Sequence, residues 1–297
     1  MITRKVKAFL ELMRLHNAFM GSLGVVIGIL LSVSDIYESP FSILLGITIY
    51  VLIASGGNAI NDYFDIEVDK VNRPNRPIPR GDVSPREVLM FSVLLWIIGT
   101  ILSFFSLSPV TLTNIPLPPL VVLFFAILGF LYSAKLKVLG FPGNIVVGIS
   151  FAFGPLFGAI LVSSTIKNTV ISCFLTSFFL LVSREIVKGI EDVEGDRLRN
   201  VKTIALRYGN FVAALMSVIF DILAIVSFTL VMINSLMLVQ IMVLTGDVIV
   251  ALAGILAITK YNEKKAQSNS SFLLKLGAFV GLLTFLFHAL LTPGFPV

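Results

Sequence analysis

Nine long apolar runs determine what this chain can fold into. They lie near residues 17–34, 41–60, 88–107, 117–134, 143–163, 168–187, 210–232, 236–258 and 271–292. A helix of about 20 apolar residues crosses a hydrocarbon core about 30 Å thick. With 57% hydrophobic and only 13% charged residues, the chain is more apolar than soluble domains are. We therefore expect an all-α integral membrane protein with nine transmembrane helices, formed as a single domain over residues 1–297.

The basic residues predict how these helices are oriented. Of the 22 Lys and Arg, all except Lys167 lie in the N-terminal segment or in and beside the loops that follow even-numbered runs. Such segments face the cytoplasm under the positive-inside rule. We therefore expect a multi-pass cell-membrane protein with a cytoplasmic N-terminus, cytoplasmic charged loops and an outside C-terminus. The net charge of +5 then reflects topology and contact with membrane lipids, not nucleic acid.

Two acidic clusters follow the second and the sixth run. Asp65 and Asp69 belong to the first, Asp192 and Asp196 to the second, and both pairs have the spacing DxxxD. Because the clusters lie four runs apart, we expect two four-helix pseudo-repeats followed by a ninth helix, with both clusters on one face of the membrane. Carboxylates beside a membrane are costly and repel one another, so such pairs need a compensating cation.

The donor atoms of the clusters are those that Mg²⁺ prefers. On a continuous helix, residues spaced by four lie on one face. Four facing carboxylates would balance two Mg²⁺ ions and leave them able to hold a diphosphate. Asp62 and Glu67 would point elsewhere, as an outer shell or a solvated helix end. The expected metal ligands are Asn61, Asp65, Asp69, Asp192 and Asp196.

A diphosphate also needs cations from the protein. The loop from Asn72 to Gly81 contains Arg73, Arg76 and Arg80, and three prolines stiffen its backbone. Guanidinium groups bind phosphate oxygens in pairs. The alternative is that these arginines only set topology and bind lipid head groups. Arg14, at the start of the first run, would reach the same phosphate.

The chemistry that fits these residues is Mg²⁺-assisted departure of diphosphate from an allylic carbon. Metal ions and arginines stabilise the charge on the leaving group. The allyl cation that remains needs an apolar chamber, because water would capture it. Membrane spans provide such a chamber, and aromatic faces among the 25 Phe would stabilise the cation.

At these residues the chain resembles the UbiA-type superfamily of intramembrane prenyltransferases. The match is to the segment 61–69 with Asn72 and the segment 76–79, and to the segment 192–196 with Lys202 and Thr203. The resemblance implies nine helices around a central cavity, a cytoplasmic cap of charged loops, two Mg²⁺ between the acidic motifs and an isoprenyl diphosphate donor. The expected phosphate contacts are Arg14, Asn17, Asn61, Asn72, Arg73, Arg76, Arg80, Lys135, Arg184 and Lys188.

Members of the superfamily often have a Tyr and a Lys after the fourth helix that help to ionise the diphosphate. Here the region contains Tyr132, Lys135 and Lys137, and its spacing differs from the Tyr-x-x-x-Lys of some members. Either lysine fits, and we favour Lys137. The expected catalytic residues are Asp65, Asp69, Tyr132, Lys137, Asp192 and Asp196. Gly189 stands where related chains often have another acid.

Within the superfamily, the segments 132–137 and 183–192 look most like the archaeal digeranylgeranylglyceryl phosphate synthases. The resemblance implies transfer of a geranylgeranyl group from its diphosphate to the hydroxyl of geranylgeranylglyceryl phosphate, which forms the second ether bond of archaeal lipids. Arg184 and Lys188, with Arg197 and Lys202, are cations available for an acceptor phosphate. Enzymes acting on hydroxybenzoate or on quinone, haem or chlorophyll precursors are the alternative.

A transporter is the alternative from another class. Asp221 and Asp247 lie deep in the seventh and eighth runs, where carboxylates often serve ion pathways. The acidic clusters, however, lie at the rim of the spans and not at their middle. A phosphatidyltransferase would keep its acids within one stretch of chain. We therefore expect an enzyme.

Overall fold

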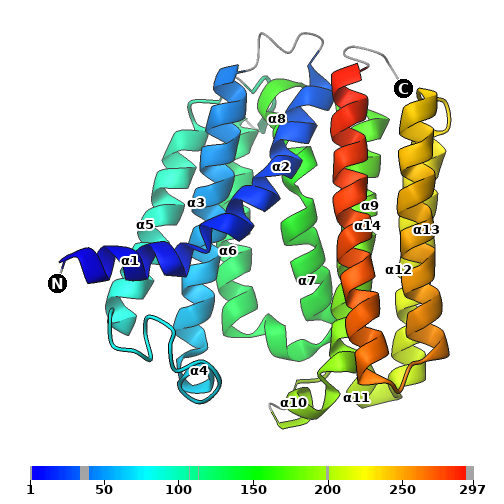
Figure 1. Ribbon diagram of the computed structural model, residues 1–297. Helices are drawn as coiled ribbons and strands as arrows, with labels where there is room; N and C mark the ends of the chain where they lie inside the picture. Colours follow the sequence, from blue (N-terminus) through cyan, green and yellow to red (C-terminus); the bar gives the residue numbers. More distant parts are fainter. Residues whose placement is uncertain (1, 34–39, 107, 113, 199–200, 292–297) are drawn as a thin grey trace.

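The computed structural model describes residues 2–33, 40–106, 108–112, 114–198 and 201–291, and nearly all of them are helical (Figure 1). A ninth span is formed by two helices, α7 (Phe141–Ala152) and α8 (Gly154–Val162), which meet at an angle of 41°. Together with eight longer apolar helices, this pair gives the nine spans that the sequence predicts. The eight are α2 (Leu15–Ser32), α3 (Pro40–Phe64), α5 (Pro85–Ser103), α6 (Leu117–Ala134), α9 (Asn168–Glu191), α12 (Asn210–Met232), α13 (Met237–Thr259) and α14 (Lys264–Leu291).

The bend between α7 and α8 follows from Pro155, which has no backbone N–H to continue the hydrogen bonds of α7. The bent pair approaches α2 closely. A methyl group on Gly28 would lie 2.0 Å from the Pro155 carbonyl oxygen, and one on Gly158 would lie 2.1 Å from the Val25 carbonyl oxygen. Small residues permit this backbone contact between membrane helices.

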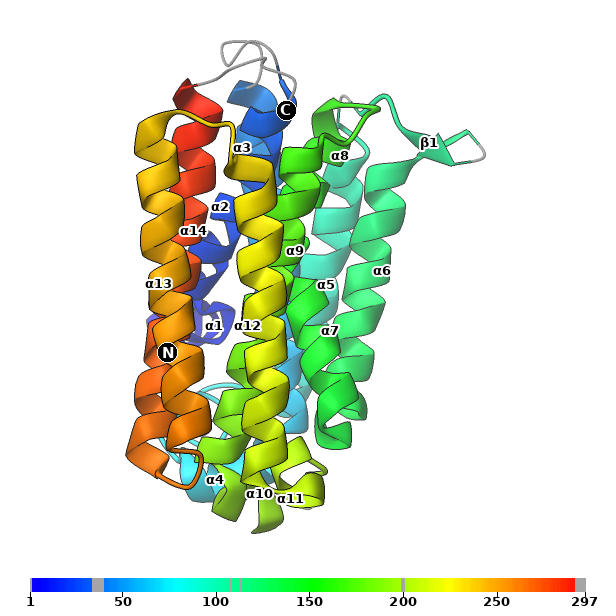
Figure 2. The ribbon, with the colours of Figure 1, turned by 90° about the vertical axis from the view of Figure 1, so that its right-hand side faces the viewer.

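The spans form a closed bundle in which the two halves meet along α2 and α8 (Figures 1 and 2). In the first half, α3 packs against α2, α5 and α6. In the second half, α9 packs against α7, α8, α12 and α14. The ninth helix, α14, also contacts α13 and α2 and so joins the second half to the first.

Short elements lie at the two ends of the bundle. The helices α4 (Ile66–Asn72), α10 (Val193–Leu198) and α11 (Ile204–Tyr208) all lie at its lower end in Figures 1 and 2. The two-residue strands β1 (Thr111–Leu112) and β2 (Ile115–Pro116) pair antiparallel at the other end. Near the lower end, a 3₁₀ helix, η2 (Leu136–Leu139), joins α6 to α7. Chain segments that are far apart in the sequence therefore meet at one end.

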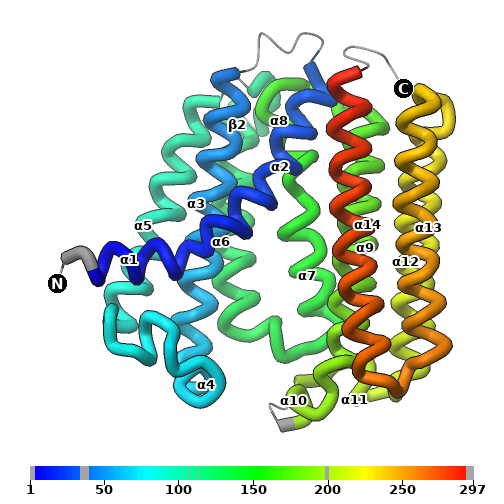
Figure 3. Tube along the Cα trace, in the orientation of Figure 1, coloured from blue at the N-terminus to red at the C-terminus, as the bar shows by residue number. Residues whose placement is uncertain are grey.

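The N-terminal helix α1 (Ile2–Met13) runs across the other helices instead of along them (Figure 3). Its buried face carries Ala8 and Leu12, which pack against Ala59 of α3. Its other face exposes Val6 and Leu10, each about half accessible. An amphipathic helix with this placement is typical of the membrane interface.

One helix differs from its apolar run at its start. α14 begins at Lys264, before the run that starts near residue 271. The added turns are polar but make hydrogen bonds to α13 and to the residue after it. Gln267 donates to the carbonyls of Ala257 and Lys260 at 3.0 Å, and Ser270 donates to the Ala253 carbonyl at 2.9 Å. Hydropathy alone therefore places this helix start too late.

Candidate active site

The two acidic motifs begin at matching helix breaks. Asp65 separates α3 from α4, and Asp192 separates α9 from α10. Their backbone angles are φ −91°, ψ 8° and φ −102°, ψ 15°, both in the sparsely occupied bridge region. The expected continuous helix is therefore wrong at both motifs, and Figure 1 shows α4 nearly end-on below the vertical α3. The matching breaks agree with the expected internal repeat.

Asp62 lies at the centre of the first motif. Its carboxylate is buried, and its Oδ1 accepts hydrogen bonds from Arg14 and from Arg76, the latter at 2.7 Å. The same Arg76 nitrogen donates to Asp69 Oδ2, also at 2.7 Å. Because the helix bends at Asp65, Asp62 and Asp69 share one guanidinium. Of the two readings that the sequence leaves open for Asp62, the contacts exclude a solvated helix end and agree with an outer shell around the acidic motif.

Lys137 reaches the first motif from the loop between α6 and α7. Its ammonium group forms an ion pair with Asp65 Oδ1, and both side chains are 24% exposed. Lys135, the other candidate, is exposed, and no ion pair is found for it within the described ranges. Of the two lysines that the sequence leaves open, the structure brings Lys137 to the acidic motif.

The segment that carries Lys137 also contacts the chain after the second motif. The backbone N–H of Lys202 donates to the Val138 carbonyl at 3.1 Å. Gly140 has φ +73°, and a methyl group there would lie 1.8 Å from the Lys202 carbonyl oxygen. This segment therefore joins the two motifs, through the Lys137 side chain on one side and through its backbone on the other.

Arg14 occupies a break between α1 and α2, and its backbone has φ 48° and ψ 50°. A non-glycine residue in this left-handed region costs about 1–2 kcal/mol. Two residues of α3 hold the break in place: Asp62 accepts from the Arg14 guanidinium, and Asn58 donates to the Met13 carbonyl at 3.1 Å. The strain is localised where α1 turns into the first span.

Arg80 is engaged by protein groups instead of facing the acidic motif. Its guanidinium bonds Asp82 at 2.5 Å, Glu11 at 3.0 Å and the Asn75 carbonyl at 2.7 Å. Desolvation opposes the ionisation of Asp82, but hydrogen bonds from Arg80 and Arg4 outweigh it and lower the pKa of Asp82. These contacts fasten the arginine-rich loop to α1.

The second motif is more open than the first. Asp192 is exposed and forms no ion pair with the residues described, whereas Asp196 is half-buried. Two turns before Asp192, Glu185 accepts from Arg184 at 3.3 Å and lies 3.4 Å from the Lys188 ammonium group. The buried Arg184 Nε has no hydrogen-bond partner within the described part of the chain.

Tyr132, near the end of α6, faces charges on two other elements. Its half-buried phenol interacts electrostatically with Asp65 of the first motif and with Glu185 of α9. The remaining predicted phosphate contacts are partly or fully exposed. Asn61 is half-buried, and Asn17, Asn72 and Arg73 are exposed.

The residues present fit Mg²⁺ in the chemistry of their donors, since carboxylate oxygens are its usual ligands. Within the described ranges, no group of three or more His, Cys, Asp or Glu side chains is close enough to hold a metal ion by itself. Asp65 and Asp69 are paired with Lys137 and Arg76, while Asp192 is open. A metal at this end of the bundle would therefore need oxygen ligands from a substrate phosphate as well.

Sequence reasoning missed the position of two acidic side chains. Asp62 precedes Asp69 by two helical turns, and Glu185 precedes Asp192 by the same spacing. Residues at i and i+7 lie on one helix face. The helix breaks at Asp65 and Asp192 interrupt that periodicity, so the equal spacing of the two acids in both halves is the signal that the sequence offered.

Comparison with known proteins agrees with this architecture. Residues 22–289 match the UbiA prenyltransferase family. A protein named digeranylgeranylglyceryl phosphate synthase from Pyrococcus furiosus is 36% identical over 288 residues, which are 96% of this chain and 98% of that protein. A protein of the same name from Saccharolobus solfataricus is 41% identical over 206 residues, which are 69% and 70% of the two chains.

Two solved structures have a similar fold. One, from work on "the biosynthesis of Digeranylgeranylglyceryl phosphate synthase in membranes", has a TM-score of 0.82 and 31% identity, and covers 97% of this chain and 99% of that one. The other is a UbiA homolog from Archaeoglobus fulgidus bound to DMAPP and Mg²⁺, with a TM-score of 0.67 and 15% identity over 93% and 98% of the chains. At that identity, the second likeness concerns the fold alone. The chain belongs to the UbiA prenyltransferase family and is a multi-pass membrane prenyltransferase.

Proposed function

We propose that this protein transfers a geranylgeranyl group from its diphosphate to the hydroxyl of geranylgeranylglyceryl phosphate. In this reaction the bond between C1 of the donor and its diphosphate breaks, and diphosphate leaves with the electron pair. The acceptor oxygen forms the new ether bond and loses its proton, which the released diphosphate is able to take. The product would be the doubly prenylated glyceryl phosphate of archaeal membrane lipids.

The observation that carries the proposal is that both acidic helix breaks lie at one end of an apolar bundle (Figure 1), where cations pair with the carboxylates of the first motif. Lys137 pairs with Asp65, and Arg76 pairs with Asp62 and Asp69. Cations beside the acidic motif would stabilise the negative charge that develops on a departing diphosphate. The protein from Pyrococcus furiosus that matches 96% of this chain carries the name of this activity.

Mg²⁺ is the cofactor that we assign to the site, with two ions as the expected number. The ligands would be Asn61, Asp65, Asp69, Asp192 and Asp196. Bound Mg²⁺ would neutralise the diphosphate and stabilise it as a leaving group. For Asp65 and Asp69 to bind metal, Lys137 and Arg76 would turn from the carboxylates to the phosphate oxygens. The same two cations would then neutralise the carboxylates in the empty site and the diphosphate in the occupied site.

The remaining cations support a second, phosphorylated substrate. Arg184 has a buried Nε without a partner among the described residues, and it shares Glu185 with Lys188. A buried guanidinium nitrogen left unpaired is costly, and an acceptor phosphate would satisfy it. An aromatic acid would supply a carboxylate instead, and the aromatic acceptor is therefore the second candidate within the same mechanism.

We place the acidic breaks on the cytoplasmic side of the membrane, with the N-terminus inside and the C-terminus outside. The support is the distribution of Lys and Arg, which gather at the end that carries α4, α10 and α11. The donor diphosphate would then reach the site from the cytoplasm, and the whole chain would act as one domain.

Product analysis by mass spectrometry tests the proposal. Purified protein with Mg²⁺ and geranylgeranyl diphosphate is offered geranylgeranylglyceryl phosphate in one reaction and hydroxybenzoate in another. We expect the doubly prenylated glyceryl phosphate in the first. If only prenylated hydroxybenzoate forms, the proposed acceptor is wrong but the mechanism stands. If neither product forms and the protein does not bind the diphosphate, the proposal is overturned.

A further inference from the structure

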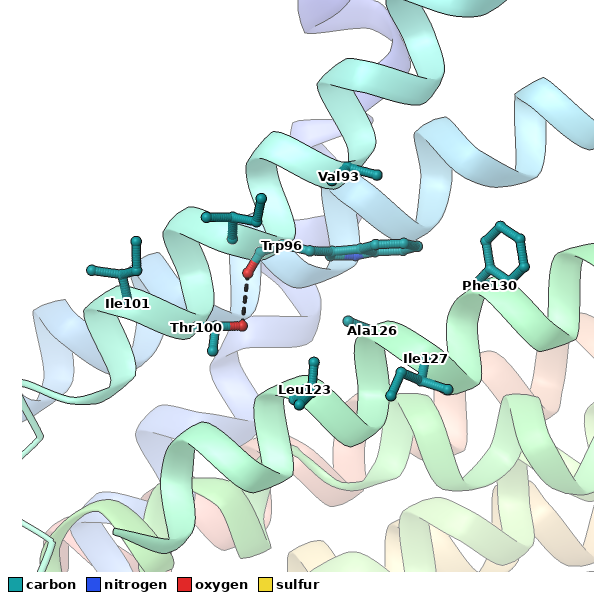
Figure 4. Close-up of a pocket in the computed structure, with 9 residues that line it drawn as sticks. Val93, Trp96, Thr100, Ile101, Leu123, Ala126, Ile127 and Phe130 are labelled. Atoms are coloured by element: carbon teal, nitrogen blue, oxygen red, sulfur yellow. Dashed lines mark hydrogen bonds between the residues drawn. The ribbon is translucent and has the colours of Figure 1, made fainter. Parts of the chain in front are cut away.

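A groove between α5 and α6 has no role in the chemistry described so far. Its volume is about 420 Å³, within the range of small-molecule sites. Ile97 and Ile127 on its rim are each 51% exposed on the outer side of the bundle. Figure 4 shows Trp96 reaching from α5 toward α6, with Ala126 opposite. The groove is therefore open to the bilayer.

The lining accepts hydrocarbon and excludes polar groups. Its two side-chain polar groups are already satisfied: Thr100 Oγ1 donates to the Trp96 carbonyl at 2.8 Å, and Trp96 Nε1 donates to the Ile53 carbonyl at 3.2 Å. The other lining side chains are apolar. Gly56 leaves room for the indole, since a methyl group there would lie 2.5 Å from its nitrogen.

One end of the groove lies beside the acidic site. The groove runs along α5 between Ile101 and Val93, a rise of about 12 Å. On α6 it ends at Phe130, whose ring lies 5.5 Å from the ring of Phe64 in an edge contact. Phe64 directly precedes Asp65 at the first helix break. A chain in the groove would thus have its head at the site and its tail toward the bilayer.

We propose that this groove holds the isoprenoid chain of the lipid acceptor, an inference that rests on the proposed function. The product carries two long chains on one glycerol, so the site needs two separate apolar paths. A branched product cannot be drawn out of two closed tunnels, whereas a groove open along its side releases one chain directly into lipid. The acceptor is itself a membrane lipid and would enter by the same side.

Filling the groove tests the inference. Ala126→Phe places an aromatic ring in the groove. Ile127→Trp covers the groove from an exposed position, where a larger side chain destabilises the folded protein less. Leu94→Phe, on an exposed part of α5 outside the groove, is the matched control. Displacing about two buried CH₂ groups weakens binding about tenfold. We expect both groove variants to raise KM for geranylgeranylglyceryl phosphate by at least that factor, with KM for the donor unchanged.

A glyceryl phosphate that carries only a five-carbon ether distinguishes binding of the acceptor's isoprenoid chain from binding of its phosphate head group. Because this acceptor is too short for the groove, the groove variants should use it as well as the wild type does. If KM for the donor rises instead, the groove binds the isoprenoid chain of the donor. If the kinetics of both groove variants are unchanged, the groove holds bilayer lipid and no substrate. Either result overturns the inference. If the wild-type protein does not use the native acceptor at all, it is the proposed function that fails.

Discussion

Asp65 and Asp192, the residues at the two helix breaks, are the carboxylates on which the proposed chemistry depends most. Replacing either by Asn keeps the shape of the side chain but removes its charge, so we expect kcat to fall more than about 100-fold. Glu67 is a matched control for Asp65, because it lies on α4 with a side chain 82% exposed and pairs with Lys70. Glu67→Gln should change kcat by no more than about twofold.

These variants are compared after size-exclusion chromatography in detergent, so that only folded protein is assayed. Near-normal turnover of folded Asp65→Asn or Asp192→Asn would remove the metal assignment. If Glu67→Gln lowers kcat as much as Asp65→Asn does, activity depends on the total negative charge of the motif and not on the position of each carboxylate.

Lys137 and Lys135 offer a second comparison within one short segment. Lys137 pairs with Asp65, whereas Lys135 is exposed. If Lys137 stabilises the departing diphosphate, Lys137→Met should lower kcat about 100-fold with a smaller change in donor KM, since the interaction strengthens as charge develops. Lys135→Met should be close to wild type. Steady-state kinetics with varied donor decide between them, and equal losses would argue that both lysines only attract the anionic donor.

The connection between η2 and α7 depends on Gly140. Alanine there would adopt φ +73° at a cost of about 1–2 kcal/mol and would also clash with the Lys202 carbonyl. Gly81 is the matched control, because it has φ +78° but nothing within 4 Å of an added methyl group. Both variants should lower the thermal unfolding midpoint in detergent, Gly140→Ala more, and only Gly140→Ala should also lower kcat. Equal effects would mean that the contact with Lys202 does not position the site.

At the level of elements, hydropathy predicted the spans well and the breaks within them poorly. The runs near 117–134 and 210–232 coincide with α6 and α12, because a bilayer-spanning helix needs a continuous apolar segment. The breaks at Asp65 and Asp192 have no proline or glycine to reveal them. At the first break, Asp62 accepts a hydrogen bond from Arg76 in the loop beyond α4, a contact that a helical pattern does not contain.

Across the whole molecule, the sequence predicted that the two acidic motifs share one end but not how that end is held together. The repeat of four spans is enough to bring α4 and α10 to the same side. Three connections then complete the arrangement: the break between α1 and α2 through Arg14, the arginine-rich loop through Arg76, and the segment after α6 through Lys137. Each contact joins residues from different parts of the chain, and each depends on the final packing of the bundle.

The proposed orientation of the bundle rests on the distribution of Lys and Arg, and it can be measured on intact cells. The native Cys173 is fully buried, so a single engineered cysteine is labelled selectively. Ser164→Cys lies in the exposed connection between α8 and α9, and Asn75→Cys lies in the exposed arginine-rich loop. We expect a membrane-impermeant maleimide to label the first from outside and the second only after permeabilisation, because Lys and Arg are retained in the cytoplasm. The reverse pattern would place the acidic breaks outside, where a cytoplasmic diphosphate donor could not reach them.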